Sequence, residues 1–279
     1  MDTHALHLLF HFSPISSSHL LESTKDMFPF RSASYAKEQK VHLLLCASGS
    51  VATIKIPLIC HSLSKYHDSL SIRLILTTSS IEFLQGQSSE QPSLDKILQI
   101  PGVDGIYTDA DEWAHPWSRT GPAGSIPILH IELRKWADIM VVAPLSANTM
   151  AKIVSGMSDN LITSVIRAWD TDASVDGLRD HFRDLGEKRL IEVNGIKQER
   201  KGEFLKNKKI LLCPAMNTAM WRQPITGKHI QKLKKELFGG YIEVLEPTSK
   251  ELACGDVGDG AMINWEELVG ILKLSCCCS

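Results

Sequence analysis

The sequence lacks an excess of charge of either sign. Its 279 residues include 30 Lys and Arg against 32 Asp and Glu, so the formal net charge is -2. Proteins that bind nucleic acid usually carry an excess of basic residues on one face. The balance of charge therefore argues against nucleic acid as a partner.

Long apolar runs are also missing. No stretch of about 18 consecutive apolar residues occurs, which is the length that a transmembrane helix requires. The N-terminal segment has no basic region ahead of its short apolar patches, and it contains Asp2, Glu22 and Asp26. These features are unlike a secretory signal or a transit peptide. We therefore expect a cytoplasmic protein with no membrane segment.

The seven cysteines form neither a metal-binding nor a disulfide pattern. No two of them have the spacing of zinc ligands, and the adjacent cysteines at 276–278 are poor disulfide partners. We expect reduced thiols and no bound metal. Residues 275–279 are expected to be a frayed tail, with acylation of its cysteines as the alternative.

The sequence does contain a regular alternation of short apolar runs and helical patterns. Apolar runs predict strands over residues 41–46, 71–77, 126–131, 138–143, 209–213 and 241–245. Apolar residues at helical spacing predict helices over residues 51–63, 147–169, 226–238 and 265–274. Pro57 lies inside the first of these helices and is expected to bend it. Apolar strands that alternate with helices are typical of a mainly parallel sheet covered on both faces, so we expect one doubly wound α/β domain over residues 41–274.

Three segments break this alternation. Residues 1–40 are rich in Ser and His and are expected to form a disordered arm. Residues 86–125 contain several Pro and Gly and are expected to be an irregular surface excursion. Residues 171–206 are rich in charges of both signs, which predicts a solvated insertion between a helix and the next strand. A surface that binds a partner is the alternative for this insertion.

Small and polar residues follow three of the predicted strands, at residues 49–51, 77–80 and 144–149. In doubly wound folds, ligands bind beyond the carboxyl ends of the strands, and N–H groups at the start of a helix can bind a phosphate. Each junction could instead serve only to cap its helix. Three of them at one edge favour a phosphate-bearing ligand, although the G-x-G-x-x-G fingerprint of dinucleotide-binding proteins is absent.

Longer motifs resemble the flavin-binding cysteine decarboxylases. These motifs are His130-Ile131-Glu132-Leu133, Trp136-Ala137-Asp138 and Ala143-Pro144-Leu145-Ser146-Ala147-Asn148-Thr149. The motifs that resemble the phosphopantothenoylcysteine branch are Lys152, Asp159-Asn160-Leu161 and Arg167-Ala168-Trp169-Asp170. Pro214 to Trp221 matches the P-x-M-N-x-x-M-W motif of that branch. The stretch that resembles its substrate-covering flap comprises Leu252-Ala253-Cys254-Gly255-Asp256, Gly258, Gly260, Ala261 and Met262.

The resemblance implies a flavoprotein Rossmann-like three-layer fold and FMN as the cofactor. The positions that would bind FMN are Gly49, Ser50, Val51, Thr77, Ser79, Ser146, Ala147, Asn148, Thr149 and Ala215. The phosphate would lie near residues 49–51, and the chain and ring near the others.

The resemblance also implies which residues carry the reaction. His130 would be the catalytic base, which suits an imidazole because it exchanges protons near neutral pH. Cys254, in a Gly-rich mobile flap, would return a proton to the reaction intermediate. Asn217 would hold the substrate carboxylate, and Ala253 and Met262 would complete the substrate site. Outside such motifs, a lone Cys is usually a packed core residue.

The implied reaction is the FMN-dependent decarboxylation of 4′-phosphopantothenoylcysteine to 4′-phosphopantetheine in coenzyme A synthesis. Members of the family are homotrimers in which different chains supply the histidine and the asparagine. Because this chain keeps His130, Asn217 and Cys254 together, we expect a homotrimer. The charged insertion and the serine-rich arm also resemble the fungal halotolerance proteins. The alternative function is therefore inhibition of a Ser/Thr protein phosphatase, and that phosphatase or a coenzyme A biosynthetic complex would be a protein partner.

Overall fold

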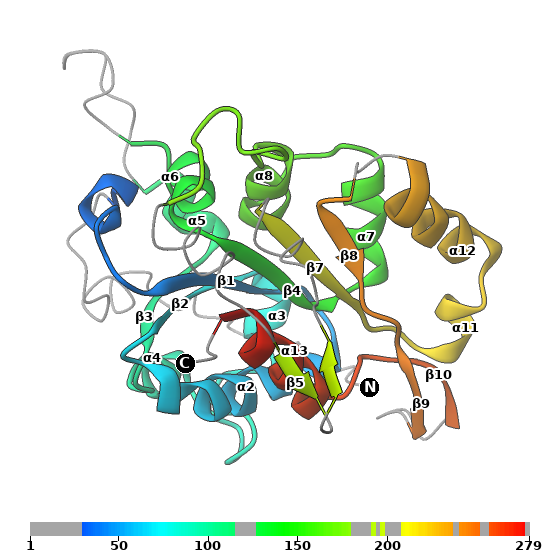
Figure 1. The fold of residues 1–279 in the computed structure, drawn as a ribbon. Helices are drawn as coiled ribbons and strands as arrows, with labels where there is room; N and C mark the ends of the chain where they lie inside the picture. The colour runs from blue at the N-terminus through cyan, green and yellow to red at the C-terminus, as the bar shows by residue number, and fades with distance from the viewer. Residues whose placement is uncertain are drawn as a thin grey trace, which may run out of the picture.

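The computed structural model describes residues 30–114, 127–179, 191–193, 196–198, 208–236, 240–251 and 257–276. They form a three-layer α/β fold around a six-stranded sheet (Figure 1). The strands are β1 (Val41–Ala47), β2 (Leu70–Leu76), β3 (Val103–Tyr107), β4 (Ile139–Leu145), β7 (Lys209–Pro214) and β8 (Ile242–Val244). They lie in the order β3-β2-β1-β4-β7-β8, and every neighbouring pair is parallel. The doubly wound fold predicted from the sequence is confirmed.

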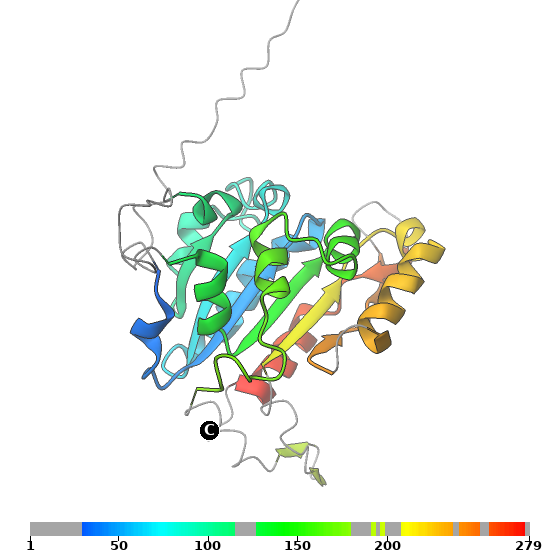
Figure 2. The same ribbon diagram turned by 90° about the horizontal axis from the view of Figure 1, so that it is seen from above.

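The central strands are mostly apolar, and helices cover both faces of the sheet (Figure 2). Every residue of β1 is buried. Its side chains alternate between two cores, with Leu43 and Leu45 in one and Leu44 and Cys46 in the other. A strand buried on both faces reads as a continuous apolar run rather than an alternating one, which is why its position could be predicted.

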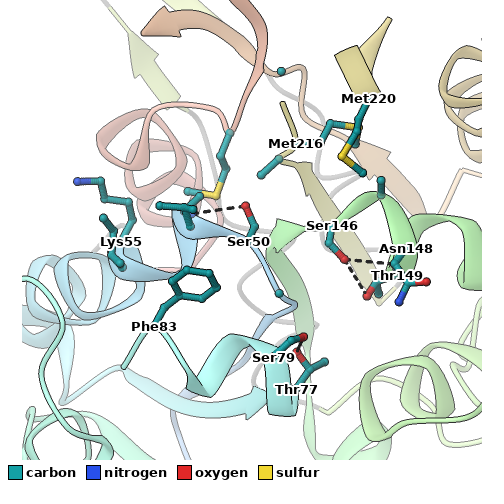
Figure 3. Close-up of a pocket in the computed structure, with 18 of the residues that line it drawn as sticks. Ser50, Lys55, Thr77, Ser79, Phe83, Ser146, Asn148, Thr149, Met216 and Met220 are labelled. Atoms are coloured by element: carbon teal, nitrogen blue, oxygen red, sulfur yellow. Dashed lines mark hydrogen bonds between the residues drawn. The ribbon is translucent and has the colours of Figure 1, made fainter. Parts of the chain in front are cut away.

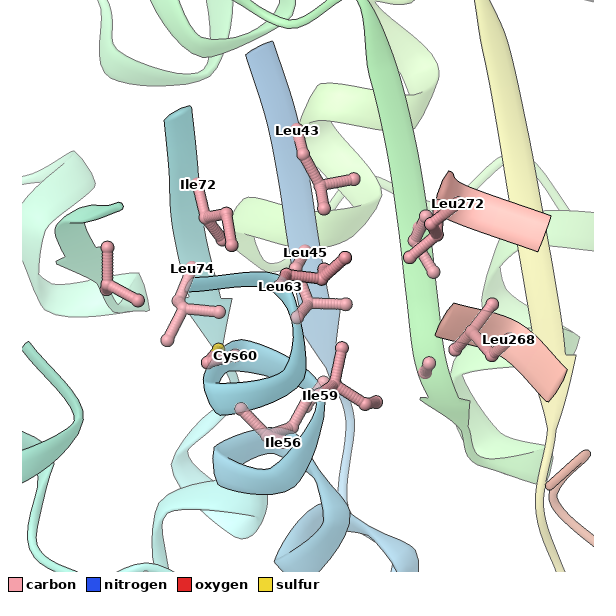
Figure 4. Close-up of a cluster of buried hydrophobic side chains, with 14 of the residues drawn as sticks. Leu43, Leu45, Ile56, Ile59, Cys60, Leu63, Ile72, Leu74, Leu268 and Leu272 are labelled. Carbon is pink, nitrogen blue, oxygen red and sulfur yellow. The ribbon is translucent and has the colours of Figure 1, made fainter. Parts of the chain in front are cut away.

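Two hydrophobic cores hold the helices to the sheet. The first lies between the sheet and α2 (Ile56–Leu63), α4 (Leu94–Leu98) and α13 (Trp265–Cys276). Figure 4 shows the side chains that α2 and α13 contribute. The second lies between the opposite face and α6 (Leu129–Trp136), α7 (Ala147–Val154) and α8 (Leu161–Arg167). The remaining elements are η1 (Ser32–Tyr35), η2 (Val51–Lys55), η3 (Ser64–Tyr66), α3 (Thr78–Ile81), α5 (Asp109–Glu112), β5 (Ile191–Val193), β6 (Ile196–Gln198), α11 (Thr218–Trp221), α12 (Pro224–Gln231), η4 (Lys232–Glu236), β9 (Thr248–Glu251) and β10 (Val257–Ala261).

The predicted strand at residues 126–131 is wrong, because this stretch enters α6 at Leu129. The buried side chains of α6 are Leu129, Leu133 and Trp136, which recur at helical spacing. The apolar residues just before the helix extended the run and made it resemble a strand. His130 therefore lies in the first turn of a helix.

Other predicted boundaries were also wrong. The predicted helix over residues 147–169 is two helices, because α7 ends before Gly156, whose positive φ of 71° interrupts helical geometry, and Asn160 caps α8. Pro57 lies in the first turn of α2, where its missing N–H costs no hydrogen bond, and not in a helix interior. The predicted helix over residues 226–238 begins earlier, at Pro224 of α12, and passes into the π-helical turn η4.

Two segments expected to be irregular contain packed structure. Residues 86–125 include α4 and β3, and β3 is the edge strand that pairs with β2. Residues 30–40 belong to the folded domain, because Phe30 is buried in the second core and its ring lies against Tyr107 and Trp136. The rest of the expected arm lies outside the described residues.

Within the described ranges, no helix is both long enough and apolar enough to cross a membrane. In the same part of the chain, no group of three or more His, Cys, Asp or Glu side chains is placed to hold a metal ion.

Candidate functional site

A pocket of about 1070 Å³ lies at the carboxyl end of the sheet. Its walls come from the segments that follow β1, β2, β4 and β7, together with β10 and the start of α13 (Figure 3). β1 and β4 are neighbours in the sheet, although the chain forms β2 and β3 between them. The pocket therefore occupies the switch point where doubly wound folds bind their ligands.

Every position predicted to contact the cofactor lines this pocket. They are Gly49, Ser50, Val51, Thr77, Ser79, Ser146, Ala147, Asn148, Thr149 and Ala215. The structure thus brings together residues that are up to 166 positions apart in the sequence because all of them follow parallel strands that end at the same edge.

The hydroxyl groups in these turns cap helices as well as line the pocket. The Ser146 side chain accepts a hydrogen bond of 3.2 Å from the backbone N–H of Thr149, at the start of α7. Thr77 caps α3 in the same way, accepting from the N–H of Ser80 at 3.3 Å. Capping fixes the rotamers of these side chains. The same hydroxyl groups can therefore cap a helix and line a ligand site.

Close packing fixes the shape of the pocket floor. Ser48 is buried, and its hydroxyl donates to the carbonyl of Pro144 at 3.1 Å and accepts from the N–H of Ser146 at 2.8 Å. This side chain ties the end of β1 to the end of β4. Beside it, a Cβ at Gly49 would lie 2.4 Å from Oγ of Ser79, so only glycine fits where the two turns meet. Sequence reasoning missed Ser48, because a hydroxyl inside a turn gives no spacing signal.

The far wall of the pocket carries two of the predicted substrate contacts. Asn217 and Met262 both line it. Oδ1 of Asn217 accepts from the N–H of Met220 at 2.8 Å, which commits the oxygen to capping α11 and leaves the amide N–H₂ group available to a ligand. Met216 donates its backbone N–H to the carbonyl of Gly260 at 2.9 Å, and this bond holds β10 against the turn. Two other predicted residues, Ala253 and Cys254, lie outside the described residues.

Charged side chains line the pocket at positions that were not predicted to bind a ligand. Lys152 and Asp159 form an ion pair of 2.5 Å, which lowers the pKa of the Asp159 carboxyl. Asp109 accepts from the N–H of Leu161 at 2.8 Å, and burial raises the pKa of its carboxyl above the ordinary value. Asp109 lies in the segment expected to be irregular, so its place beside the pocket could not be predicted from the strand pattern.

His130 does not line the pocket of its own chain. It lies near the start of α6, where Nδ1 is 2.6 Å from Oε1 of Glu112 and the imidazole is partly exposed. Two large apolar side chains next to this pair in sequence are exposed: Trp113, which follows Glu112, at 82%, and Ile128, two residues before His130, at 51%.

Comparison with known proteins places this architecture in a family. The model of the Flavoprotein family matches residues 31–275. A phosphopantothenoylcysteine decarboxylase of Oryza sativa subsp. japonica is 37% identical over 237 residues, which are 85% of this chain and 81% of the relative.

Solved structures agree with this result. A PPC decarboxylase mutant complexed with pantothenoylaminoethenethiol is 34% identical, with a TM-score of 0.58 over 84% of this chain and 97% of that one. The FMN binding protein AtHal3 is also 34% identical, with a TM-score of 0.57 over 84% of this chain and 96% of that one.

Proposed function

This chain belongs to the Flavoprotein family, and its relatives include phosphopantothenoylcysteine decarboxylases. On that premise we propose that it decarboxylates 4′-phosphopantothenoylcysteine to 4′-phosphopantetheine with FMN. This reaction is a step of coenzyme A synthesis. The observation that carries the proposal is the pocket, because one cavity is lined by every predicted cofactor position and also by Asn217 and Met262.

The residues at the pocket floor fit a flavin mononucleotide. A phosphate would fit beside Gly49 and Ser50, where a small-residue turn opens into η2, because N–H groups at the start of a helix can bind an anion. The close approach of Gly49 to Ser79 shows that this turn is tightly shaped. Ser146 and Thr149 supply hydroxyls for the polar chain of the cofactor. The isoalloxazine ring would then lie toward Ala215, beside the substrate wall.

The proposed reaction assigns distinct tasks to the cofactor and to three side chains. Bound FMN would supply the two-electron chemistry that turns the cysteinyl side chain into a thioaldehyde and returns the electrons after CO₂ leaves. His130 would accept a proton from the substrate at Nε2. The amide N–H₂ of Asn217 would hold the carboxylate before it is lost. Cys254 would return a proton to the resulting enethiolate. Because the electrons removed in the first step are returned in the last, no net oxidation takes place.

A homotrimer accounts for the position of His130. The imidazole lies outside the pocket of its own chain, whereas the proposed chemistry requires it next to the substrate. The exposed Trp113 and Ile128 support an interface at this surface. We propose that His130 of one subunit reaches the pocket of the next, as the resemblance to trimeric decarboxylases implies.

The direct test is to purify the protein, record its absorbance spectrum and assay it with 4′-phosphopantothenoylcysteine. We expect a yellow protein that releases FMN on denaturation and forms CO₂ and 4′-phosphopantetheine in equal amounts without an added oxidant. Flavin binding with no CO₂ from this substrate would reject the proposed reaction.

The alternative role as a phosphatase inhibitor stays a prediction, which the same preparation can test in a Ser/Thr phosphatase assay.

Changing Gly49 to Ala is expected to weaken FMN binding about ten- to a hundredfold. The new Cβ would lie 2.4 Å from Oγ of Ser79, and relieving an overpacked contact costs about 1–3 kcal/mol. The measurement is a fluorescence titration of the apoprotein with FMN. Gly227→Ala is the matched control, because nothing lies within 4 Å of a Cβ at that position. Equal FMN affinity of the Gly49→Ala variant and the wild type would remove this turn from the cofactor site.

A further inference from the structure

The side chain of Glu112 lies against His130 and uses both of its carboxylate oxygens on that one residue. Oε1 is 2.6 Å from Nδ1 of the imidazole, and Oε2 accepts a 3.0 Å hydrogen bond from the backbone N–H of His130. The Glu112 side chain is only 8% exposed, against 26% for His130. A buried carboxylate is costly unless it is fully hydrogen-bonded, and His130 supplies both of the bonds that the structure shows for it.

The contact with Nδ1 decides which ring nitrogen carries the proton. An ionised carboxylate can only accept hydrogen bonds, so Nδ1 must be the protonated nitrogen in the neutral imidazole. The lone pair then lies on Nε2, the nitrogen that faces away from Glu112. A histidine that is to act as a base at Nε2 needs this tautomer, because the other tautomer has its lone pair turned toward the carboxylate.

The contact with the backbone fixes where the ring is held. α6 begins after Ile128, whose side chain makes no capping hydrogen bond. The first N–H groups of a helix have no partner within the helix, and Glu112 satisfies that of His130 from a different helix, α5. The same side chain therefore anchors the backbone and the ring of His130.

We infer that Glu112 is a positioning residue for His130, which holds the imidazole in the Nδ1–H tautomer with Nε2 free to accept the substrate proton. This inference rests on the proposed function, because it assigns His130 as the base. Glu112 belongs to the short helix α5 and lies outside the His-Ile-Glu-Leu motif.

The variant that tests this role is Glu112→Gln in the full-length, flavin-loaded protein. A glutamine has one acceptor oxygen for the two donors of His130, and its N–H₂ group can only donate. With the oxygen on the backbone N–H, the amide N–H₂ faces Nδ1 and forces the proton onto Nε2. Asp111→Asn is the matched control, because Asp111 lies in the same helix and its carboxylate binds Thr108 instead of His130.

Two measurements separate positioning from a purely structural role. The first is ¹⁵N NMR of the imidazoles in selectively labelled protein without substrate, at a pH that leaves them neutral, with His130→Asn used for assignment. We expect the Nδ1–H tautomer in the wild type and in Asp111→Asn, and Nε2–H in Glu112→Gln. The second is steady-state kinetics, where we expect kcat of Glu112→Gln to fall about a hundredfold with KM changed less than about threefold.

The inference is overturned if the wild type shows Nε2–H at His130, a result that does not depend on whether Glu112→Gln folds. It is also overturned if Glu112→Gln keeps kcat within about threefold of the wild type. Because the NMR measurement needs no substrate, its outcome is independent of the proposed reaction. Loss of the proposed function would instead appear as absent CO₂ release in the wild type.

Discussion

Replacing His130 with Asn is expected to stop CO₂ release while the protein keeps its flavin. The change removes the only group proposed to accept the substrate proton, and loss of a positioned general base costs about 10²–10⁴-fold in rate. The fold around position 130 should survive, because the backbone N–H still donates to Oε2 of Glu112 and the amide of Asn can donate to Oε1. FMN should stay bound, since the substitution changes none of the positions proposed to hold it.

The measurement pairs CO₂ release with flavin absorbance on the same sample. Substantial turnover by the variant would remove His130 from the catalytic role. Loss of flavin along with activity would show instead that the substitution disturbs the pocket.

Coexpression of two inactive variants tests whether neighbouring subunits share the site. If different chains supply His130 and Asn217, mixing His130→Asn with Asn217→Ala creates interfaces that contain both native residues. Random assembly gives about a quarter of such interfaces, so we expect activity near that fraction of the wild type. If both residues came from one chain, every site would lack one of them, and the mixture would be as inactive as its components.

Much of the pocket could be predicted because parallel strands end at a common edge. Ser50, Thr77 and Ser146 are far apart in sequence, but each follows a buried strand, and the strand pattern alone places them together. This logic needs only the apolar runs and the residues that follow them. It does not depend on the loops between the elements.

The same logic could not find contacts made by short or isolated elements. β3 and α5 lie in a stretch rich in Pro and Gly, and the short helix α5 carries both Asp109 and Glu112. The partner of Glu112 lies 18 positions later, on α6. No periodic pattern links the two residues, so their contact became visible only in three dimensions.

Charge composition was misleading at the start of the insertion predicted for residues 171–206. The sequence suggested a solvated loop, but Arg179 lies against the base of the sheet. Its guanidinium forms an ion pair with Asp138 and donates to the carbonyls of Glu38 at 3.0 Å and Lys40 at 2.5 Å. Composition describes the average environment of a segment, and a single residue with four hydrogen-bond acceptors does not change that average.

Loss of these Arg179 contacts is expected to cause the largest decrease in stability that we predict. Replacing Arg179 with Leu leaves the carboxylate of Asp138 buried, at 1% exposure, without its ion-pair partner. The backbone N–H of His42 would still donate to it at 2.8 Å, but a buried charge that loses its partner costs about 3–5 kcal/mol. For a domain of this size, each kcal/mol lowers Tm by about 2–4 °C, so we expect Tm to fall by about 10 °C.

Calorimetry of three variants would separate this cause from a general loss of packing. Arg222→Leu is the matched control, because Arg222 pairs with Asp259 at 3.0 Å but the two side chains are 68% and 49% exposed. Such a surface pair contributes at most about 1 kcal/mol. Adding Asp138→Asn to Arg179→Leu removes the unpaired negative charge and keeps an acceptor for the backbone N–H of His42. The Tm of this double variant should therefore partly recover. If Arg179→Leu melts as the wild type does, residues 171–179 do not anchor the sheet, and the charged segment is the solvated loop that its composition suggests.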